Sequence, residues 1–157
     1  MNRTSLAIVA TAFLAGIAAA AAIPARAESR VPCDTLPAHV LSRAKSEAGD
    51  ATIHGCVKDK ENGKVTYEVE TLKDGKSRDF VLDASGSVIE VEQEVTVSSL
   101  PAAVSDAIAK AAQGGKVGKI ESVTRGGAIA SYETTITRNG QRREVAFSPE
   151  GTPVKAD

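Results

Sequence analysis

The stretch Tyr67-Glu68-Val69-Glu70-Thr71-Leu72-Lys73-Asp74-Gly75-Lys76 alternates apolar and polar residues and then turns at Asp-Gly. The segment from Arg78 to Gly86 continues with a second alternation and a second glycine turn. Alternation with a period of two is typical of a half-buried strand, and Asp-Gly between two such runs is a strong hairpin signal. The sequence therefore predicts a β-hairpin that leads into a third strand.

The same pattern returns near the C-terminus. Leu36-Pro37-Ala38 recurs as Leu100-Pro101-Ala102, 64 positions later, and Asp74-Gly75 recurs as Asn139-Gly140, 65 positions later. One helix start and four strand-like runs follow in each copy. We therefore predict an α+β fold of two tandem repeats, each one helix packed on a four-stranded antiparallel sheet. The expected organisation is a signal peptide at 1–27, a first repeat at 28–99 and a second repeat at 100–157.

Alternation also assigns the two faces of each predicted sheet. The four aromatic residues after position 27 all fall on the face expected to pack under the helices: Tyr67, Phe80, Tyr132 and Phe147. Tight interfaces are commonly anchored by exposed aromatic residues or arginine. Because no aromatic residue is left for such a role, the chain is expected to make modest, polar contacts with a partner.

The N-terminus has the pattern of a secretory signal peptide. Arg3 precedes a long apolar run that ends at Pro24, and Ala25-Arg26-Ala27 is an Ala-x-Ala cleavage site. An uncleaved membrane anchor is the alternative, since the apolar run approaches the length that spans a bilayer. We expect cleavage after Ala27, a periplasmic or secreted protein, and no stable membrane insertion after cleavage.

Charge excludes one class of partner. Residues 1–27 contain two arginines and no acid, so the 19 basic residues of the whole chain fall to 17 against 20 acidic ones. A chain with this acidic balance and no basic run is not expected to bind nucleic acid.

The order of motifs resembles the PepSY-like domain family. A Leu-Pro-Ala helix start is followed by Tyr-Glu-Val-Glu, Lys-Asp-Gly-Lys, Val-Leu-Asp-Ala-Ser-Gly and Ile-Glu-Val-Glu. Two such copies resemble the tandem arrangement of the β-lactamase inhibitory protein type. The resemblance implies a non-enzymatic exported protein that binds an envelope or secreted protein and could modulate or inhibit it, with a peptidase among the candidates. The alternative is a periplasmic protein that binds a metal or small ligand through an acidic sheet face or a Cys/His cluster. It carries over no catalytic residues and no cofactor.

Cys33 and Cys56 are the only cysteines. An even pair in an exported protein favours a disulfide. A metal site is the alternative, because His39 and His54 would complete a set of two thiolates and two imidazoles with Cys33 and Cys56.

No catalytic constellation is present. Hydrolase chemistry needs a nucleophile, a base and an orienting group within reach, and the two histidines lie in no such motif. The chain is therefore not expected to be an enzyme.

Acidic residues gather on the predicted solvent face of the first repeat: Glu68, Glu70, Asp79, Glu90 and Glu92. The first repeat has 9 basic and 14 acidic residues, and the second has 8 and 6. Such a face could steer a basic partner or collect cations, which makes it the candidate binding face. A face kept acidic only for solubility is the simpler alternative.

Overall fold

The computed structural model describes residues 29–61 and 63–156. The predicted signal peptide lies outside these residues. Within them, no helix has both the length and the apolar character needed to cross a membrane.

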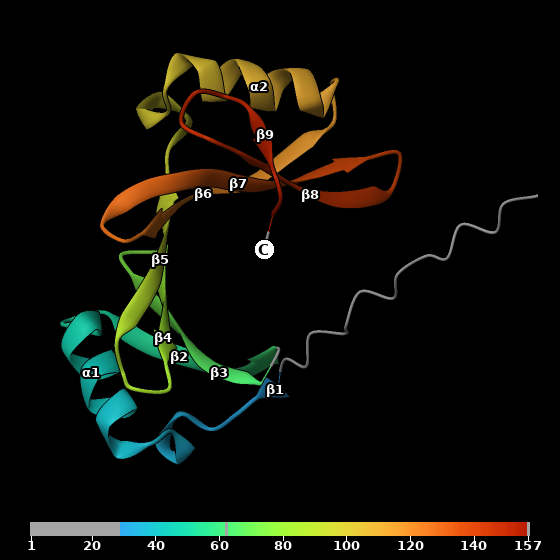
Figure 1. Ribbon diagram of the computed structural model, residues 1–157. Helices are drawn as coiled ribbons and strands as arrows, with labels where there is room; N and C mark the ends of the chain where they lie inside the picture. The colour runs from blue at the N-terminus through green and yellow to red at the C-terminus, as the bar shows by residue number, and fades with distance from the viewer. Residues whose placement is uncertain (1–28, 62, 157) are drawn as a thin grey trace, which may run out of the picture.

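One antiparallel sheet dominates the structure, and its nine strands lie in the order in which they occur in the chain (Figure 1). The strands are β1 (Ser29–Arg30), β2 (Thr52–Glu61), β3 (Lys64–Lys73), β4 (Lys76–Asp83), β5 (Val88–Val95), β6 (Lys116–Arg125), β7 (Ala128–Arg138), β8 (Gln141–Phe147) and β9 (Pro153–Val154). The α-helices are α1 (Ala38–Ala48) and α2 (Ala102–Ala112), and short 3-10 turns η1 (Cys33–Thr35) and η2 (Val97–Ser99) precede them.

The predicted fold class was wrong: the chain does not form two repeats, each with one helix on a four-stranded sheet, but a single nine-stranded sheet with two short helices. Strand β5 pairs with β6 from Glu90 opposite Arg125 to Val95 opposite Ile120, and this pairing joins all strands into one sheet. An unpaired edge leaves a row of backbone N–H and C=O groups without partners. Pairing β5 with β6 provides hydrogen-bond partners for the edge strands that two separate sheets would have left unpaired. Alternation cannot predict this pairing, because it shows which face of a strand is buried and not which strands lie side by side.

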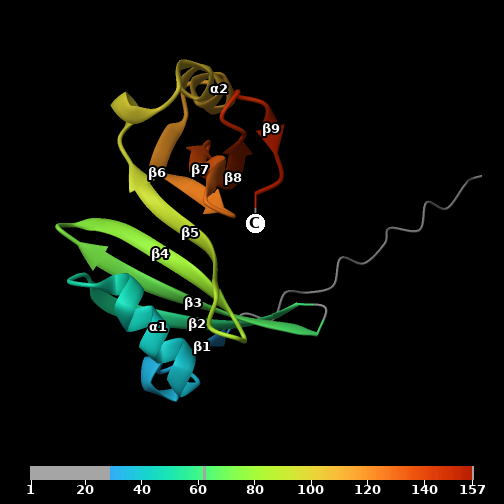
Figure 2. The ribbon, with the colours of Figure 1, turned by 60° about the vertical axis from the view of Figure 1, so that its left-hand side comes forward.

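The sheet is strongly curved, and both helices lie on its outer side (Figures 1 and 2). Each helix covers its own buried cluster. Under α1 the cluster consists of Leu36, Val40, Ala44, Cys56, Tyr67, Val69, Phe80 and Leu82. Under α2 it consists of Val104, Ile108, Ala112, Ile120, Tyr132, Ile136, Val145 and Phe147. The expectation that all four aromatic side chains are buried is confirmed.

The turn chemistry at the two hairpins also follows the sequence. Asp74 and Asn139 have φ angles of 52° and 51°, and the glycines after them both have φ of 77°. Two consecutive left-handed residues make the tight turn that matches the twist of antiparallel strands. The hairpin predicted from Asp74-Gly75 is therefore confirmed.

The predicted disulfide is confirmed. Cys33 in η1 bonds to Cys56 on β2, 23 positions later in the sequence, with a Cα–Cα distance of 5.3 Å. Cys56 is buried in the first cluster, so the bond ties the segment before α1 to the sheet.

Removing the disulfide is expected to destabilise the protein. Replacing both cysteines by serine should lower the free energy of unfolding by about 3 kcal/mol, because closing a loop of this length restricts the unfolded chain. Urea unfolding of the double variant beside the wild type, with a free-thiol assay on the native protein, measures this. Two reactive thiols in native wild-type protein would contradict the assignment.

Candidate functional site

The face of the sheet opposite the helices carries the candidate site, and we call it the inner face. It lies on the inside of the curve. Successive side chains of a strand point to opposite faces, so the residues next to each buried residue in the sequence point to the inner face. Its acidic members include Glu68, Glu70, Asp79, Glu90, Glu92, Glu94, Glu121, Glu133 and Glu144, and its cations include Arg30, Lys119, Arg125 and Arg142.

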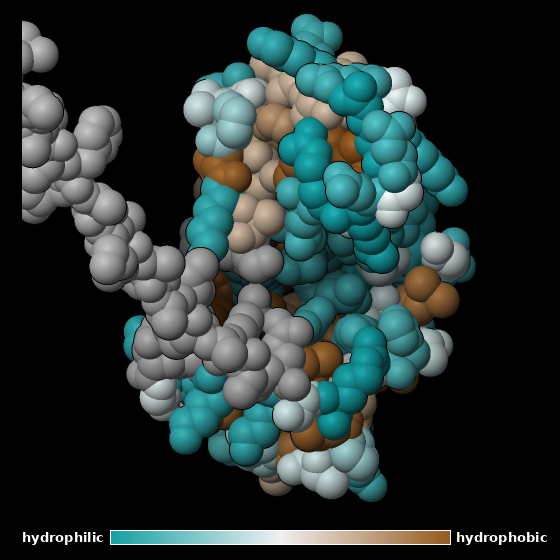
Figure 3. Space-filling model, turned by 90° about the vertical axis from the view of Figure 1, so that its right-hand side faces the viewer, coloured by the Kyte–Doolittle hydropathy of each residue, from teal (hydrophilic) through white to brown (hydrophobic). Residues whose placement is uncertain are grey.

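All five acidic residues singled out in the sequence lie on this face. Strand pairing sets Glu68 opposite Val81 and sets Val81 opposite Glu90, while Asp79 lies opposite Glu92. Figure 3 views the molecule from the open side of the curve and shows mostly hydrophilic residues beside the hollow that crosses its middle.

Sequence reasoning missed the contribution of β6. The β5–β6 pairing brings Arg125 beside Glu90, with 2.5 Å between Nε and Oε2. Lys119 reaches across to β4, where its Nζ donates to the Ser77 hydroxyl at 2.9 Å, and it also pairs with Glu121 at 2.7 Å. No local pattern marks these contacts, because they depend on two strands that belong to different halves of the chain.

Besides Glu90, two more of the predicted acidic residues have partners within the protein. Both carboxylate oxygens of Glu70 accept hydrogen bonds from Arg30, at 2.8 and 2.6 Å, and His54 Nδ1 lies 3.8 Å from the same carboxylate. Asp79 accepts a hydrogen bond from the backbone N–H of Thr71 at 2.8 Å. Burial nevertheless raises the pKa of Asp79, since that effect outweighs the Thr71 hydrogen bond that favours the charged form.

Glu92 is the most perturbed group on the inner face. Burial raises its pKa to about 8, and hydrogen bonding with Glu90 and the negative charge of that residue act in the same direction. The charges of Glu121 and Glu68 add to the rise. Carboxylates that share a poorly solvated site cannot all ionise at low cost, so Glu92 retains its proton at neutral pH.

One ionisable group on β7 and one on β6 also have raised pKa values. Burial raises the pKa of Glu133, and the hydrogen bond that it accepts from the Ser131 hydroxyl only partly offsets this. Burial alone would lower the pKa of Lys119, but its hydrogen bond and charge interaction with Glu121 raise it overall. The inner face therefore holds an excess of negative charge in partly dehydrated surroundings, where an additional cation would be favoured.

The alternative metal set is not assembled. Cys33 and Cys56 form the disulfide, and the His39 ring nitrogen lies 3.0 Å from the carbonyl oxygen of Ala84. His54 lies on β2 beside Glu70. Within residues 29–61 and 63–156, no three His, Cys, Asp or Glu side chains are grouped so that they could hold a metal ion.

Comparison with known proteins supports the fold. Residues 37–92, which include α1 and β2 to β4 and most of β5, match the PepSY family model, described as the peptidase propeptide and YPEB domain. No curated protein sequence matches the chain with significance.

Several solved structures share the architecture. A protein of Bacteroides eggerthii described as periplasmic aligns with a TM-score of 0.61 and 16% identity, over 76% of this chain and 86% of its own. A DUF2874 family protein of Bacteroides ovatus aligns with a TM-score of 0.59 and 17% identity, over 78% and 86%. A BLIP-like protein of Bacteroides fragilis aligns with a TM-score of 0.54 and 18% identity, over 76% and 83%.

Identities at this level show a shared fold alone. The curved sheet with helices on its outer side is the architecture that these structures have in common with the chain. The resemblance noted in the sequence is thus confirmed: residues 37–92 match the PepSY family model, and the chain has a PepSY-like fold shared with a BLIP-like protein.

Proposed function

We propose that this protein is an exported, non-enzymatic binding module whose inner face takes up a lysine- or arginine-rich segment of an envelope or secreted protein. The observation that carries the proposal is the uncompensated negative charge of the inner face. Carboxylates outnumber the cations there, and burial and mutual repulsion keep the pKa values of Glu92 and Glu133 high. A cationic side chain entering the face would relieve that repulsion.

A peptidase is the first partner class to test. The description of the family model that matches residues 37–92 names a peptidase propeptide, which makes a peptidase a natural partner to test. The scarcity of exposed aromatic residues favours a salt-sensitive, moderate interaction over a very tight one. The acidic face, rather than an apolar anchor, would then select the partner.

Binding should depend on charge at the inner face. A labelled lysine-rich peptide is expected to bind the wild type, and Glu68→Gln with Glu94→Gln should weaken it about fivefold, as expected for two partly exposed ion pairs. Fluorescence anisotropy at low and high salt measures this, because screening should abolish the interaction.

The matched control removes the same two charges elsewhere. Asp34→Asn with Asp106→Asn neutralises exposed carboxylates on η1 and α2, on the outer side of the sheet. This variant should bind the lysine-rich peptide like the wild type. A glutamate-rich peptide should bind neither the wild type nor this variant. Equal weakening by both double variants would show that only net charge matters and would overturn the proposed site.

Binding should also strengthen as the pH rises from about 6 to about 8.5. Glu92 has to lose its proton before it can pair with a cation, and its pKa is about 8. Glu92→Gln is expected to remove much of this pH dependence while leaving the affinity near pH 6 unchanged. A wild-type affinity that is constant over this range would exclude Glu92 from the contact.

A further inference from the structure

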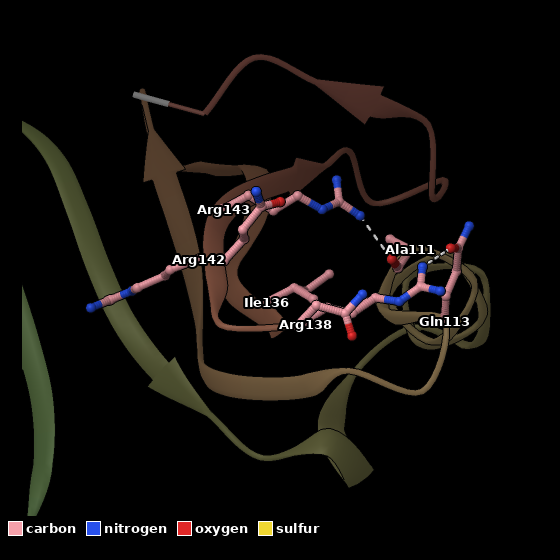
Figure 4. A pocket seen from close by; sticks show the side chains of 8 residues that line it. Ala111, Gln113, Ile136, Arg138, Arg142 and Arg143 are labelled. Carbon is pink, nitrogen blue, oxygen red and sulfur yellow. Dashed lines mark hydrogen bonds between the residues drawn. The ribbon is translucent and has the colours of Figure 1, made fainter.

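A pocket lies on the outer side of the sheet, between the end of α2 and the β7–β8 hairpin (Figure 4). Its volume is about 700 Å³. Its lining includes Ala111, Gln113, Ile136, Arg138, Asn139 and Arg143. No carboxylate lines it, so the pocket is basic in a protein that is acidic overall.

The last turn of α2 orients both arginines. Arg143 donates from NH2 to the carbonyl oxygen of Ala111 at 2.7 Å, and Arg138 donates to the side-chain carbonyl oxygen of Gln113. Figure 4 shows both side chains directed toward the end of the helix, whereas Arg142 points away from it. Each guanidinium has five N–H donors, so these single hydrogen bonds leave donors for a ligand.

In the first half of the chain, the corresponding arginine has a carboxylate partner. There, Arg78 lies 65 positions before Arg143, the same offset that separates Asp74-Gly75 from Asn139-Gly140, and it therefore corresponds to Arg143. Its NH1 donates to the carbonyl oxygen of Glu47 at 3.2 Å. Its NH2 also lies 3.7 Å from the Glu47 carboxylate. Arg78 therefore makes the same contact with the helix end as Arg143 does and also has a carboxylate partner.

The second cation is neutralised in the same way. Lys73 corresponds to Arg138, and its Nζ lies 2.8 Å from both carboxylate oxygens of Asp50. Both cations at the end of the first hairpin thus pair with acidic residues at the end of α1.

In the second half the cations remain and both acids are gone. The positions that correspond to Glu47 and Asp50 are Ala111 and Gly114. Among the described residues, no ion pair joins a carboxylate to Arg138 or Arg143 at 4.0 Å or less. Arg138 and Arg143 are thus held in place by the end of α2 without the carboxylates that pair with their counterparts in the first half.

We propose that this pocket binds a small ligand with two carboxylate groups, one beside Arg138 and one beside Arg143. Guanidinium and carboxylate match in geometry and form charge-assisted hydrogen bonds. Asn139 and Gln113 supply further polar contacts, and buried Ile136 lies beneath the ligand's apolar carbons. This site is separate from the inner face and does not depend on the function proposed for that face.

Succinate is the probe, and isothermal titration calorimetry at constant ionic strength is the measurement. Arg138→Gln should weaken succinate binding about tenfold, as expected from the loss of a charge-assisted pair. Ala111→Glu restores the acid that the first half carries and should compete for Arg143, which again weakens binding about tenfold.

Ala109→Glu is the matched control, because it places the same charge on an exposed position of the same helix. It should bind succinate within about twofold of the wild type, since residues two positions apart on a helix do not face each other and an exposed charge is screened by salt. Circular dichroism confirms that each variant is folded. Succinate binding that is absent in the wild type, or equal in Ala111→Glu and Ala109→Glu, would overturn the proposal.

Phosphate and acetate distinguish the ligand chemistry. A dicarboxylate site should bind acetate much more weakly than succinate, because acetate can satisfy only one arginine. If phosphate binds as tightly as succinate, the site is a general oxyanion site, and the assignment to dicarboxylates is wrong.

Discussion

Glu92→Gln is expected to stabilise the protein at alkaline pH by on the order of 4 kcal/mol, because each pKa unit corresponds to about 1.4 kcal/mol. Few single substitutions stabilise a protein this much. The reason lies in the surroundings of Glu92, where burial and the neighbouring carboxylates oppose its ionisation. Glutamine has nearly the same shape as the protonated acid and carries no charge at any pH.

The pH dependence of this effect follows from the direction of the shift. The pKa of Glu92 rises from its ordinary 4.5 to about 8 in the folded protein. Between these values the folded state keeps a proton that the unfolded state has lost. The stability that Glu92 contributes is therefore fully present below about pH 4.5 and is lost as the pH rises through about 8.

Urea unfolding at pH 5, 7 and 8.5 measures the difference. Near pH 5, wild type and Glu92→Gln should differ by less than about 1 kcal/mol, and the gap should widen as the pH rises. Glu150→Gln is the control, because Glu150 is exposed on the β8–β9 turn and its pKa is lowered by the Ser148 hydroxyl. A wild-type and Glu92→Gln difference that stays constant from pH 5 to 8.5 would show that Glu92 ionises normally.

Phe80→Ala is expected to lower the free energy of unfolding by about 4 kcal/mol, in the range observed for large-to-small changes in cores. Phe80 on β4 is completely buried at the centre of the cluster under α1, so its removal leaves a cavity. Arg78 also loses a contact, because its guanidinium carbon lies 5.0 Å from the centre of the ring. Stabilities of small proteins are typically about 5–15 kcal/mol, so this one change removes a large part of the total.

The same variant tests whether the continuous sheet makes the protein one cooperative unit. If the β5–β6 pairing couples the two halves, amide hydrogens on β3 and on β7 should lose protection together in Phe80→Ala. Hydrogen exchange measured by mass spectrometry reports both regions in one experiment. Ile129→Ala is the control, since Ile129 is 42% exposed on β7 and its truncation should cost less than about 1 kcal/mol. Loss of protection confined to residues before Val97 would mean that the halves unfold independently.

Local chemistry explains why so much of the architecture could be predicted. The Leu-Pro-Ala helix starts, the Asp-Gly and Asn-Gly turns and the burial of Tyr67 and Phe80 each depend on residues close together in sequence. Period-two alternation places Glu68 and Glu70 on the face away from the helices without knowledge of the tertiary structure. The disulfide followed from an even cysteine count in a chain expected to be exported.

The sequence by itself thus determined the elements, the faces of the strands and the identity of the acidic residues. Only the tertiary structure decided that β5 pairs with β6, which replaces two sheets by one and brings Arg125 to Glu90 and Lys119 to Ser77. It also decided which carboxylates are paired within the protein, as Glu70 is with Arg30, and which are forced to keep a proton, as Glu92 is. The physical reason is that edge pairing, dehydration and charge neighbours depend on segments far apart in the chain, whereas turns and alternation depend on adjacent residues.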